Sequence, residues 1–411
     1  MAREMKDSGI EWIGEIPFDW DFRRLRFLCN IKTGNQDTQD NDPDGIYPFY
    51  VRSPKMERSN SYTFDGEAIL MAGDGVGAGK IFHYVDGKYG CHQRVYSLQQ
   101  IRNISRRFLF YYLQNRFYIS IDIANSKSTV DSVRLDMLQD FLVVFPGIHE
   151  QQRICSFLDT KCAQIDAVIE QTRTSIEEYK KLKQAVITQA VTKGIRPNRP
   201  NKDSGIEWVS TIPVEWESIN PKALFTQRKE KANPGERQLT ASQQHGVVYQ
   251  DEYMNLTGSK IVTVEKDFDI LKHVEAGDFV ISMRSFQGGL EYSTNTGSIS
   301  SAYVMLIPNL NKVFPRFYRW LLKSSVYINA LQSTTNMVRD GQAMRYANFI
   351  QVRLYEVPRK EQKEIADYLD EKCTIIDQLI IQKEKLLSEL EKYKKALIFM
   401  YITGKKEVCS I

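Results

Sequence analysis

A run of closely spaced glycines is the first place where this sequence could do chemistry. Residues 73–80 read GDGVGAGK, and glycine loops that end on lysine can wrap backbone N–H groups around a phosphate. The run departs from that pattern, because no glycine stands at position 74 and Ile81 replaces the Ser or Thr that would hold magnesium. It predicts a flexible loop, or a close approach to a phosphate backbone, rather than a nucleotide site.

Other chemistry-bearing residues form no complete site. His83 and His92 lie close to Cys91, but a zinc site needs more ligands than this. An adenine methyltransferase would need an Asn/Asp-Pro-Pro-Tyr/Phe loop, and residues 233–235 (NPG) and 198–200 (NRP) do not supply one. Nothing in the spacing of serines and histidines fixes a catalytic triad. The sequence therefore predicts no catalytic residue and no metal site.

The elements that position these residues come from an internal repeat. The heptapeptide KDSGIEW at residues 6–12 returns unchanged at 202–208, and the Ile-Pro pair and tryptophan that follow it return at the same offset of 196. A second match, at an offset of 211, runs without a gap between residues 150–187 and 361–398. Both matched segments are therefore predicted to be the same element in two copies.

That element is predicted to be a long helix. Residues 150–192 contain no Pro or Gly, and apolar residues recur in steps of three and four, as in helices that pack along another helix. In the first copy this stripe comprises Leu158, Cys162, Ile165, Ile169, Thr172, Ile176 and Tyr179. In the second it comprises Leu369, Cys373, Ile376, Ile380, Leu387, Leu390 and Leu397, with Lys383 interrupting. The two helices are predicted to pair antiparallel; the alternative is that each packs on its own domain alone.

The inserts between these elements are predicted to be mixed α/β. Expected strands lie at 68–71, 95–98, 141–145, 279–283 and 302–307, and amphipathic helices at 106–119 and 315–331. The predicted fold is thus two α/β (α+β) domains separated by a long antiparallel two-helix coiled coil, with a pseudo-twofold repeat. Its segments are a first domain (1–146), a central helix (147–200), a second domain (201–358) and a C-terminal helix (359–411).

Composition places the chain among ordinary globular proteins. No run of about eighteen apolar residues is present, and residues 1–7 are polar, so we expect a cytoplasmic protein that does not contact membrane. Six scattered cysteines without a CxxC pair fit reduced thiols. The net charge is +4, and most of the excess lies in residues 193–360, with 22 basic against 16 acidic residues. This distribution is compatible with a basic patch on the second domain.

Two duplicated motifs carry a family resemblance. The KDSGIEW-x-G-x-IP-x-x-W opening, and a proline followed by EQ-x-x-I-x-x-x-LD at 146–159 and 358–370, resemble the specificity subunit of type I restriction–modification systems. The second copy departs only slightly, with Val209-Ser210 in place of Ile13-Gly14.

The resemblance implies a division of labour among several subunits. Each domain of this chain would read one half of a bipartite double-stranded DNA target, and the helices would set the spacing between the halves. Two modification subunits that bind S-adenosylmethionine would dock on this scaffold, and two restriction subunits that use ATP and magnesium could join. The chain itself would bind no cofactor and have no active site.

Base reading by such domains would fall to basic and amide side chains in loops, because Arg reads guanine and Asn or Gln reads adenine. In the first insert the candidates are Lys32, Asn35, Gln36, Arg52, Lys80, Gln93, Arg94 and Lys127. In the second they are Arg228, Lys229, Lys231, Gln243, Gln244, Arg284, Gln287, Arg339 and Arg345. We favour Arg284, Gln287 and the Gly288-Gly289 turn, since glycines after a strand permit close backbone approach.

Two other functions remain open. The near-neutral first half, with 18 basic against 19 acidic residues up to position 149, is also compatible with a coiled-coil scaffold whose domains bind proteins. An independent enzyme is the third possibility, and the missing motifs count against it.

Overall fold

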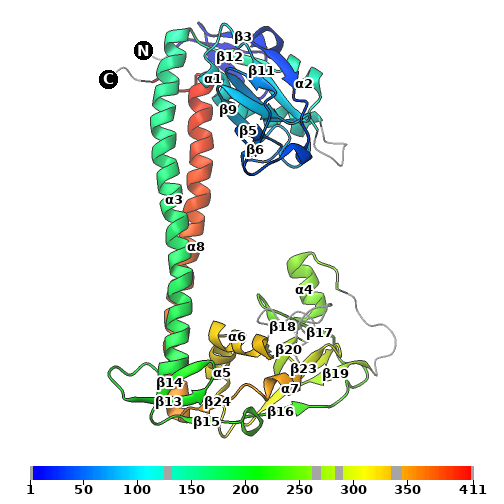
Figure 1. Ribbon diagram of the computed structural model, residues 1–411, viewed down its shortest axis with the longest axis vertical. Coiled ribbons are helices and arrows are strands. Elements are labelled where there is room, and N and C mark those ends of the chain that lie inside the picture. Colours follow the sequence, from blue (N-terminus) through cyan, green and yellow to red (C-terminus); the bar gives the residue numbers. More distant parts are fainter. Residues whose placement is uncertain (1–2, 125–131, 262–269, 283–289, 335–344, 409–411) are drawn as a thin grey trace. The chain divides into compact units, whose positions relative to one another are not determined.

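The structure, a computed structural model, describes residues 3–124, 132–261, 270–282, 290–334 and 345–408. Two compact units make up the chain: unit 1 comprises Met1–Arg173 and Lys385–Ile411, and unit 2 comprises Thr174–Glu384. The division falls inside both long helices, α3 (Ile148–Lys193) and α8 (Arg359–Ile402). It differs from the four predicted segments, because each unit combines one α/β insert with part of each long helix (Figure 1).

Unit 1 is mixed α/β. Its main sheet has four antiparallel strands in the order β4-β11-β8-β9, and a second sheet, β6-β5-β10-β7, pairs β5 with β10 in parallel. The hairpin β1–β2 and the pair β3–β12 complete its strands. The bounds are β1 (Met5–Asp7), β2 (Glu15–Pro17), β3 (Asp21–Arg24), β4 (Asn30–Thr33), β5 (Tyr47–Tyr50), β6 (Glu57–Ser59), β7 (Phe64–Asp65), β8 (Ala68–Ala72), β9 (Phe82–Val85), β10 (Lys88–Cys91), β11 (Val95–Gln99), β12 (Leu142–Phe145), α1 (Arg106–Ala124) and α2 (Leu135–Asp140).

Unit 2 repeats most of this plan. Its main sheet has the order β16-β23-β20-β21, and the hairpin β13–β14 and the pair β15–β24 match β1–β2 and β3–β12. Two small antiparallel pairs, β17–β18 and β19–β22, take the place of the second sheet. The bounds are β13 (Asn201–Ile206), β14 (Val209–Pro213), β15 (Glu217–Ile219), β16 (Phe225–Arg228), β17 (Leu239–Ser242), β18 (Gly246–Tyr249), α4 (Gln250–Thr257), β19 (Lys272–Val274), β20 (Phe279–Ser282), β21 (Leu290–Tyr292), β22 (Gly297–Ile299), β23 (Tyr303–Pro308), α5 (Pro315–Leu322), α6 (Ser325–Ser333), α7 (Tyr346–Phe349) and β24 (Leu354–Glu356).

The helix predicted at 315–331 is wrong as a single element. The chain breaks it into α5 and α6 at Ser324, whose backbone is extended with φ −66° and ψ 142°. The Ser324 hydroxyl donates a hydrogen bond to the carbonyl of Leu321 at 2.7 Å, which satisfies an acceptor at the end of α5. Apolar periodicity alone does not reveal this stop, because it continues through both helices.

The repeated heptapeptide folds into the same turn in both units. Asp7 accepts the backbone N–H of Gly9 at 3.0 Å, and Asp203 accepts that of Gly205 at 3.0 Å. Both glycines have positive φ, 67° and 62°, which residues with a Cβ rarely adopt. The identity of these residues in the two copies is therefore explained by backbone geometry.

The glutamine of the duplicated Glu-Gln pair fixes the start of each long helix to its domain. In unit 1 the Gln151 amide donates to the carbonyl of Pro146 at 2.8 Å and accepts the N–H of Ser105 at 2.7 Å. In unit 2 Gln362 makes the equivalent bonds, to the carbonyl of Val357 at 2.8 Å and from the N–H at the start of α5 at 2.7 Å. Both amides are buried, so the bonds satisfy backbone groups that water does not reach.

A carboxylate that recurs in both copies, Asp159 and Asp370, then holds the domain helix against the long helix. Arg107 of α1 lies 2.6 Å from the carboxylate of Asp159, and Arg316 of α5 donates to Asp370 at 2.9 Å. Each pair joins residues about fifty positions apart in sequence, so it fixes tertiary packing. The Leu-Asp ending of the duplicated motif is thereby explained.

Segments of α3 and α8 run antiparallel within each unit. In unit 1 Asp166 pairs with Lys394 and, farther along α3, Arg173 pairs with Glu391. The residue numbers of the contacts on α8 thus decrease as those on α3 increase, which is the mark of antiparallel helices. In unit 2 Lys183 lies 2.7 Å from Asp377, and Lys383 lies over the ring of Tyr179, which gives the same direction.

The predicted apolar stripe is buried to different degrees along the helices. The buried members are Leu158, Cys162, Ile165, Ile169, Thr172, Ile176, Leu369, Cys373 and Ile376. The half-buried members are Tyr179, Ile380, Leu387, Leu390 and Leu397. Leu158, Cys162, Leu369 and Cys373 join the hydrophobic cores of the α/β domains, whereas the other buried members lie along the helices outside those cores. No helix among the described residues has an apolar stretch able to cross a bilayer.

Candidate nucleic-acid interface

The glycine-rich run forms the connection between β8 and β9 on the main sheet of unit 1. Gly75 has φ 73° and accepts the N–H of Ala78 at 2.9 Å. A Cβ at Gly77 would lie 2.9 Å from the carbonyl oxygen of Arg52 and 2.3 Å from the Ile81 side chain. The loop is thus closely packed at its base, which only glycine permits. This corrects the expectation of a flexible loop for residues 73–80.

Two of the predicted DNA-binding arginines meet at this loop. Arg52 and Arg94 lie 2.9 and 2.6 Å from different oxygens of the Asp74 carboxylate. Partial burial raises the pKa of Asp74, but the hydrogen bonds from Arg94 and Arg52 lower it by more, so the carboxylate stays ionised at neutral pH. Both arginine side chains remain exposed, and Asp74 therefore orients two cations at the surface.

An open groove of about 540 Å³ runs beside this cluster. Arg52, Asp74, Val76 and Lys80 line it, together with the backbone of the glycine loop. Lys80 also borders a larger cavity of about 870 Å³ next to α1, α3 and α8. Basic side chains beside exposed backbone are the usual composition of a surface that contacts phosphates.

The remaining candidates of the first insert differ in accessibility. Lys32, Asn35 and Gln93 are exposed, and the Gln93 amide donates to Asp37 at 3.0 Å. Gln36 is buried, and its amide donates to the hydroxyl of Ser61 at 2.7 Å, so this predicted base-reading side chain is used inside the fold. Lys127 lies outside the described residues.

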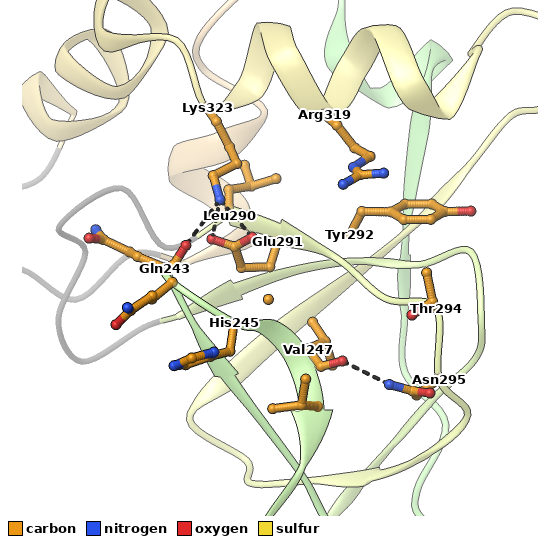
Figure 2. A pocket seen from close by; sticks show the side chains of 13 residues that line it. Gln243, His245, Val247, Leu290, Glu291, Tyr292, Thr294, Asn295, Arg319 and Lys323 are labelled. Atoms are coloured by element: carbon orange, nitrogen blue, oxygen red, sulfur yellow. Dashed lines mark hydrogen bonds and ion pairs between the residues drawn. The ribbon is translucent and has the colours of Figure 1, made fainter. Parts of the chain in front are cut away.

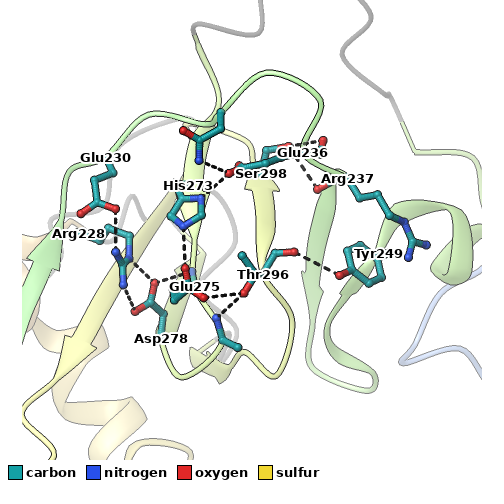
Figure 3. A network of polar contacts seen from close by, with 12 residues as sticks. Arg228, Glu230, Glu236, Arg237, Tyr249, His273, Glu275, Asp278, Thr296 and Ser298 are labelled. Atoms are coloured by element: carbon teal, nitrogen blue, oxygen red, sulfur yellow. Dashed lines mark hydrogen bonds and ion pairs between the residues drawn. The ribbon is translucent and has the colours of Figure 1, made fainter.

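Arg228 of unit 2 is likewise committed to the fold. Its Nε donates to Asp278 at 2.6 Å, and the two side chains are 12% and 2% exposed. A second contact joins it to Glu230 at 2.8 Å (Figure 3). Because the buried carboxylate requires this partner, Arg228 serves the fold in this structure and does not face outward as the predicted base-reading role would need.

His273 lies between two carboxylates in the same region. Its ring nitrogens are 2.8 Å from Glu236 and 3.1 Å from Glu275, as Figure 3 shows. Burial lowers the pKa of His273, but the hydrogen bonds and charges of Glu275 and Glu236 raise it by more, so the net shift is upward. Thr296 donates to Glu275 at 2.8 Å and extends the network to the residues before β22.

The predicted glutamines of unit 2 border a cavity of about 330 Å³. Gln243 and Gln244 are exposed in the β17–β18 turn, and Arg319 and Lys323 face the cavity from the end of α5 (Figure 2). Lys323 lies 2.7 Å from the buried carboxylate of Glu291. Burial raises the pKa of Glu291, although Lys323 opposes the shift. Sequence reasoning missed Arg319 and Lys323, because they lie on a helix rather than in a loop.

The other candidates of the second insert are exposed or lie outside the description. Lys229, Lys231 and Arg345 are exposed. Arg284, Gln287 and Arg339 lie outside the described residues, as does the Gly288-Gly289 pair. Residues 283–289 nevertheless connect β20 to β21, which is the topological counterpart of the glycine loop between β8 and β9. Asp74, which Arg52 and Arg94 contact, lies in the first of these connections, and the favoured residues of the second copy fall between β20 and β21 in the sequence.

The described residues contain no cluster of three or more His, Cys, Asp or Glu side chains that could hold a metal ion. Burial raises the pKa of the Cys29, Cys91 and Cys155 thiols to about 12, which keeps them protonated at neutral pH. Cysteine reactivity depends on the thiolate, so these residues are not poised as nucleophiles. The exposed basic and amide side chains described above are suited to binding a ligand.

Comparisons with known proteins point to one family. Residues 17–178 match the model of the type I restriction modification DNA specificity domain. The type I restriction enzyme EcoDI specificity subunit of Escherichia coli is 32% identical over 178 residues, covering 43% of this chain and 39% of that protein. The putative type I restriction enzyme MjaX specificity subunit of Methanocaldococcus jannaschii is 24% identical, covering 96% of both chains.

A solved structure shares the fold along nearly the whole chain. That structure comes from work on the structural basis underlying complex assembly and conformational transition of the type I R-M system. The TM-score is 0.68 at 14% sequence identity, with 95% of this chain and 99% of that chain covered. The two-unit α/β architecture with long helices is therefore a known one.

Proposed function

Because this chain belongs to the family of type I restriction–modification specificity subunits, we propose that it is the DNA-reading subunit of such a system, without catalytic activity of its own. It recognises a bipartite double-stranded target, one half-site per unit. The observation that carries the proposal is the match of residues 17–178 to a DNA specificity domain, whose framework contacts recur in unit 2.

The chemistry of the surface supports DNA as the ligand. In unit 1 the Arg52–Asp74–Arg94 cluster offers planar guanidinium groups in a fixed orientation, which suits bidentate contacts to phosphate or guanine. In unit 2 the Gln243-Gln244 turn offers amides of the kind that read adenine. The framework is duplicated while these side chains differ, so each unit would read a different sequence.

The two long helices are proposed to act as a spacer between the half-sites, paired as an antiparallel coiled coil. The support is the antiparallel pairing found within each unit, through Asp166 and Lys394 in one and Lys183 and Asp377 in the other. A continuous helix rises about 1.5 Å per residue, so helix length converts directly into distance. Helices of 46 and 44 residues would serve as a fixed length standard.

The same helices offer a surface for modification subunits. Val168, Leu182, Ile375, Leu386 and Tyr393 are apolar yet 43% to 57% exposed on α3 and α8. Leu386 and Tyr393 lie seven positions apart, and Val168 and Leu182 fourteen, as expected for a second helical stripe. Exposed apolar stripes of this kind mark protein interfaces. We propose one modification subunit per unit, with S-adenosylmethionine bound by that subunit and with ATP and magnesium bound by any restriction subunits.

Duplex binding across a range of salt concentrations tests the proposed function. The chain, assembled with its modification subunit, should bind a duplex carrying its target with a log affinity that falls steeply against log salt concentration. A scrambled duplex of equal length serves as control and should bind about a thousandfold or more weakly. Equal affinity for target and scrambled duplexes at every salt concentration would overturn the proposal and favour a scaffold that binds proteins.

A domain exchange tests the assignment of one half-site to each unit. Residues 217–358 would be replaced by the corresponding insert of a relative with a different target. Sequencing of methylated DNA should then show one altered half-site and one unchanged. Alteration of both half-sites, or of neither, would contradict modular reading.

A further inference from the structure

One apolar side chain in unit 1 is exposed far beyond the others. Val76 is 93% exposed at the apex of the β8–β9 connection. Among the described residues the next most exposed large apolar side chain is Ile46, at 69%. Burial of apolar area is what makes such a side chain stabilise a fold, so an isopropyl group in full contact with water contributes almost nothing there.

The apex that carries Val76 is held in place from both sides. The N–H of Ala78 bonds to the carbonyl of Gly75 at 2.9 Å, and the N–H of Gly79 bonds to the carbonyl of Ala72 at 2.9 Å. Gly77 approaches the backbone of Arg52 too closely for any Cβ. The valine is therefore presented outward on a fixed turn, with little conformational entropy left to lose on binding.

The surroundings of Val76 are cationic. It lines the same open groove as Arg52 and Lys80, and Asp74 orients Arg52 and Arg94 beside it. If these cationic side chains contact the phosphates of a DNA duplex, the edges of the neighbouring bases would lie next to Val76 at the apex of the turn. This step rests on the function proposed above.

We infer that Val76 is a specificity-determining residue, which reads a thymine by packing on its C5 methyl group in the major groove. An isopropyl group has no donor or acceptor, and the thymine methyl is the apolar feature that base edges present to a protein. Insertion between base steps uses larger side chains such as Phe, Leu, Ile or Met, so Val76 suits contact with an edge rather than unstacking.

The position of Val76 in the topology fits a role in specificity. The β8–β9 connection corresponds to the β20–β21 connection of unit 2, whose sequence at 283–289 is MRSFQGG. The flanking strands match in order and pairing, whereas the connecting residues share little beyond glycine. Two domains that read different bases need different residues at equivalent connections of the sheet that they share.

Replacement of thymine by deoxyuridine tests the contact directly, because it removes only the methyl group. The target is first mapped by sequencing DNA methylated by the assembled complex. Duplexes are then prepared in which each thymine of the unit 1 half-site is replaced in turn by deoxyuridine. Affinities are measured by fluorescence anisotropy for the wild-type complex and for complexes carrying Val76→Ala or, as a control in unit 2, Leu256→Ala. Leu256 is matched as another apolar side chain that is 67% exposed.

At one position the deoxyuridine duplex should bind the wild-type complex about fourfold more weakly, the effect of losing one buried methyl-sized group. Val76→Ala should lose a similar factor on the thymine duplex and show no further loss on the deoxyuridine duplex. Leu256→Ala should retain the wild-type difference. Because Val76 is exposed, its substitution leaves the fold intact.

Three results would overturn the inference while leaving the proposed function standing. They are a unit 1 half-site without thymine on either strand, no thymine whose replacement matters, and a deoxyuridine effect that Val76→Ala leaves unchanged. Failure of the complex to prefer its target over scrambled DNA would instead overturn the proposed function, and this inference with it.

Discussion

Lys394 of α8 donates hydrogen bonds to both carboxylate oxygens of Asp166 of α3 at 2.6 Å. The two residues are 228 positions apart, and their pairing ties α8 to the first half of α3 within unit 1. The side chains are 28% and 54% exposed, so water screens the interaction.

Loss of this pair should therefore have only a small effect on stability. Lys394→Met should lower the free energy of unfolding of unit 1 by at most about 1 kcal/mol. A double-mutant cycle with Asp166→Asn, followed by urea denaturation, measures the coupling. A coupling energy above about 2 kcal/mol would show that the pair contributes more than an exposed ion pair does.

Gln151→Ala should have a much larger effect. The buried amide satisfies the carbonyl of Pro146 and the N–H of Ser105, and both would be left without a partner. Unsatisfied buried groups cost about 1–3 kcal/mol each, so the two groups together should lower the stability of unit 1 by about 2–6 kcal/mol. The matched control is Gln152→Ala at the exposed neighbouring position, which should change little. Similar denaturation midpoints for the two variants would contradict this account of the motif.

Unit 2 should become less stable as the pH rises through the neutral range. The folded-state pKa of His273 lies above its ordinary value of 6.5, so its stabilising contribution is complete below pH 6.5 and is lost as the pH rises through the raised value. Urea midpoints measured from about pH 6 to about pH 9 should fall for the wild type. His273→Gln should flatten that dependence, and an unchanged slope in this variant would exclude the histidine as its source.

Lengthening both helices should move the half-sites apart. Insertion of seven residues into each helix preserves the apolar stripe and adds about 10 Å, which is about three base pairs of DNA. Sequencing of methylated DNA from cells carrying the extended chain should show a spacer longer by about three base pairs. An unchanged spacer would rule out the helices as the length standard. Insertion into one helix alone is the control and should impair assembly.

The exposed apolar side chains of unit 1 on the long helices, Val168, Leu386 and Tyr393, should be required if each unit binds one modification subunit as proposed. Val168→Lys combined with Tyr393→Lys places two charges on apolar positions that are 44% and 57% exposed. The folded chain should tolerate them, whereas a buried protein interface should not. Native mass spectrometry of the assembled complex should show a mass lower by one modification subunit. Retention of both subunits would assign docking to another surface.

The repeated framework was well predicted from the sequence, because residues that the backbone geometry requires recur in both copies. The turn at Gly9 and Gly205, and the buried amides of Gln151 and Gln362, need particular residues, so both copies retained them. The main strands could be found from apolar runs, and the long helices from their stripe. The break at Ser324 could not, since apolar periodicity continues across it.

The candidate site was predictable only in part. Arg52 and Arg94 were found from residue type, but their meeting on Asp74 depends on three segments distant in sequence. Gln36 and Arg228 carry the right chemistry and are used inside the fold, a difference that burial alone reveals. Val76 was missed because an apolar residue carries no polar signal, although its place between two glycines marks a turn apex.

The discontinuous make-up of unit 1 has a consequence for biosynthesis. Ile398, Tyr401 and Ile402 belong to the same hydrophobic core as Trp20 and Phe108, whereas the core of unit 2 draws on residues 187–373 alone. During translation unit 2 can close once residue 384 has left the ribosome. The domain made first must wait for residues 398–402, so a truncated product lacking them would expose an open core to chaperones and proteases.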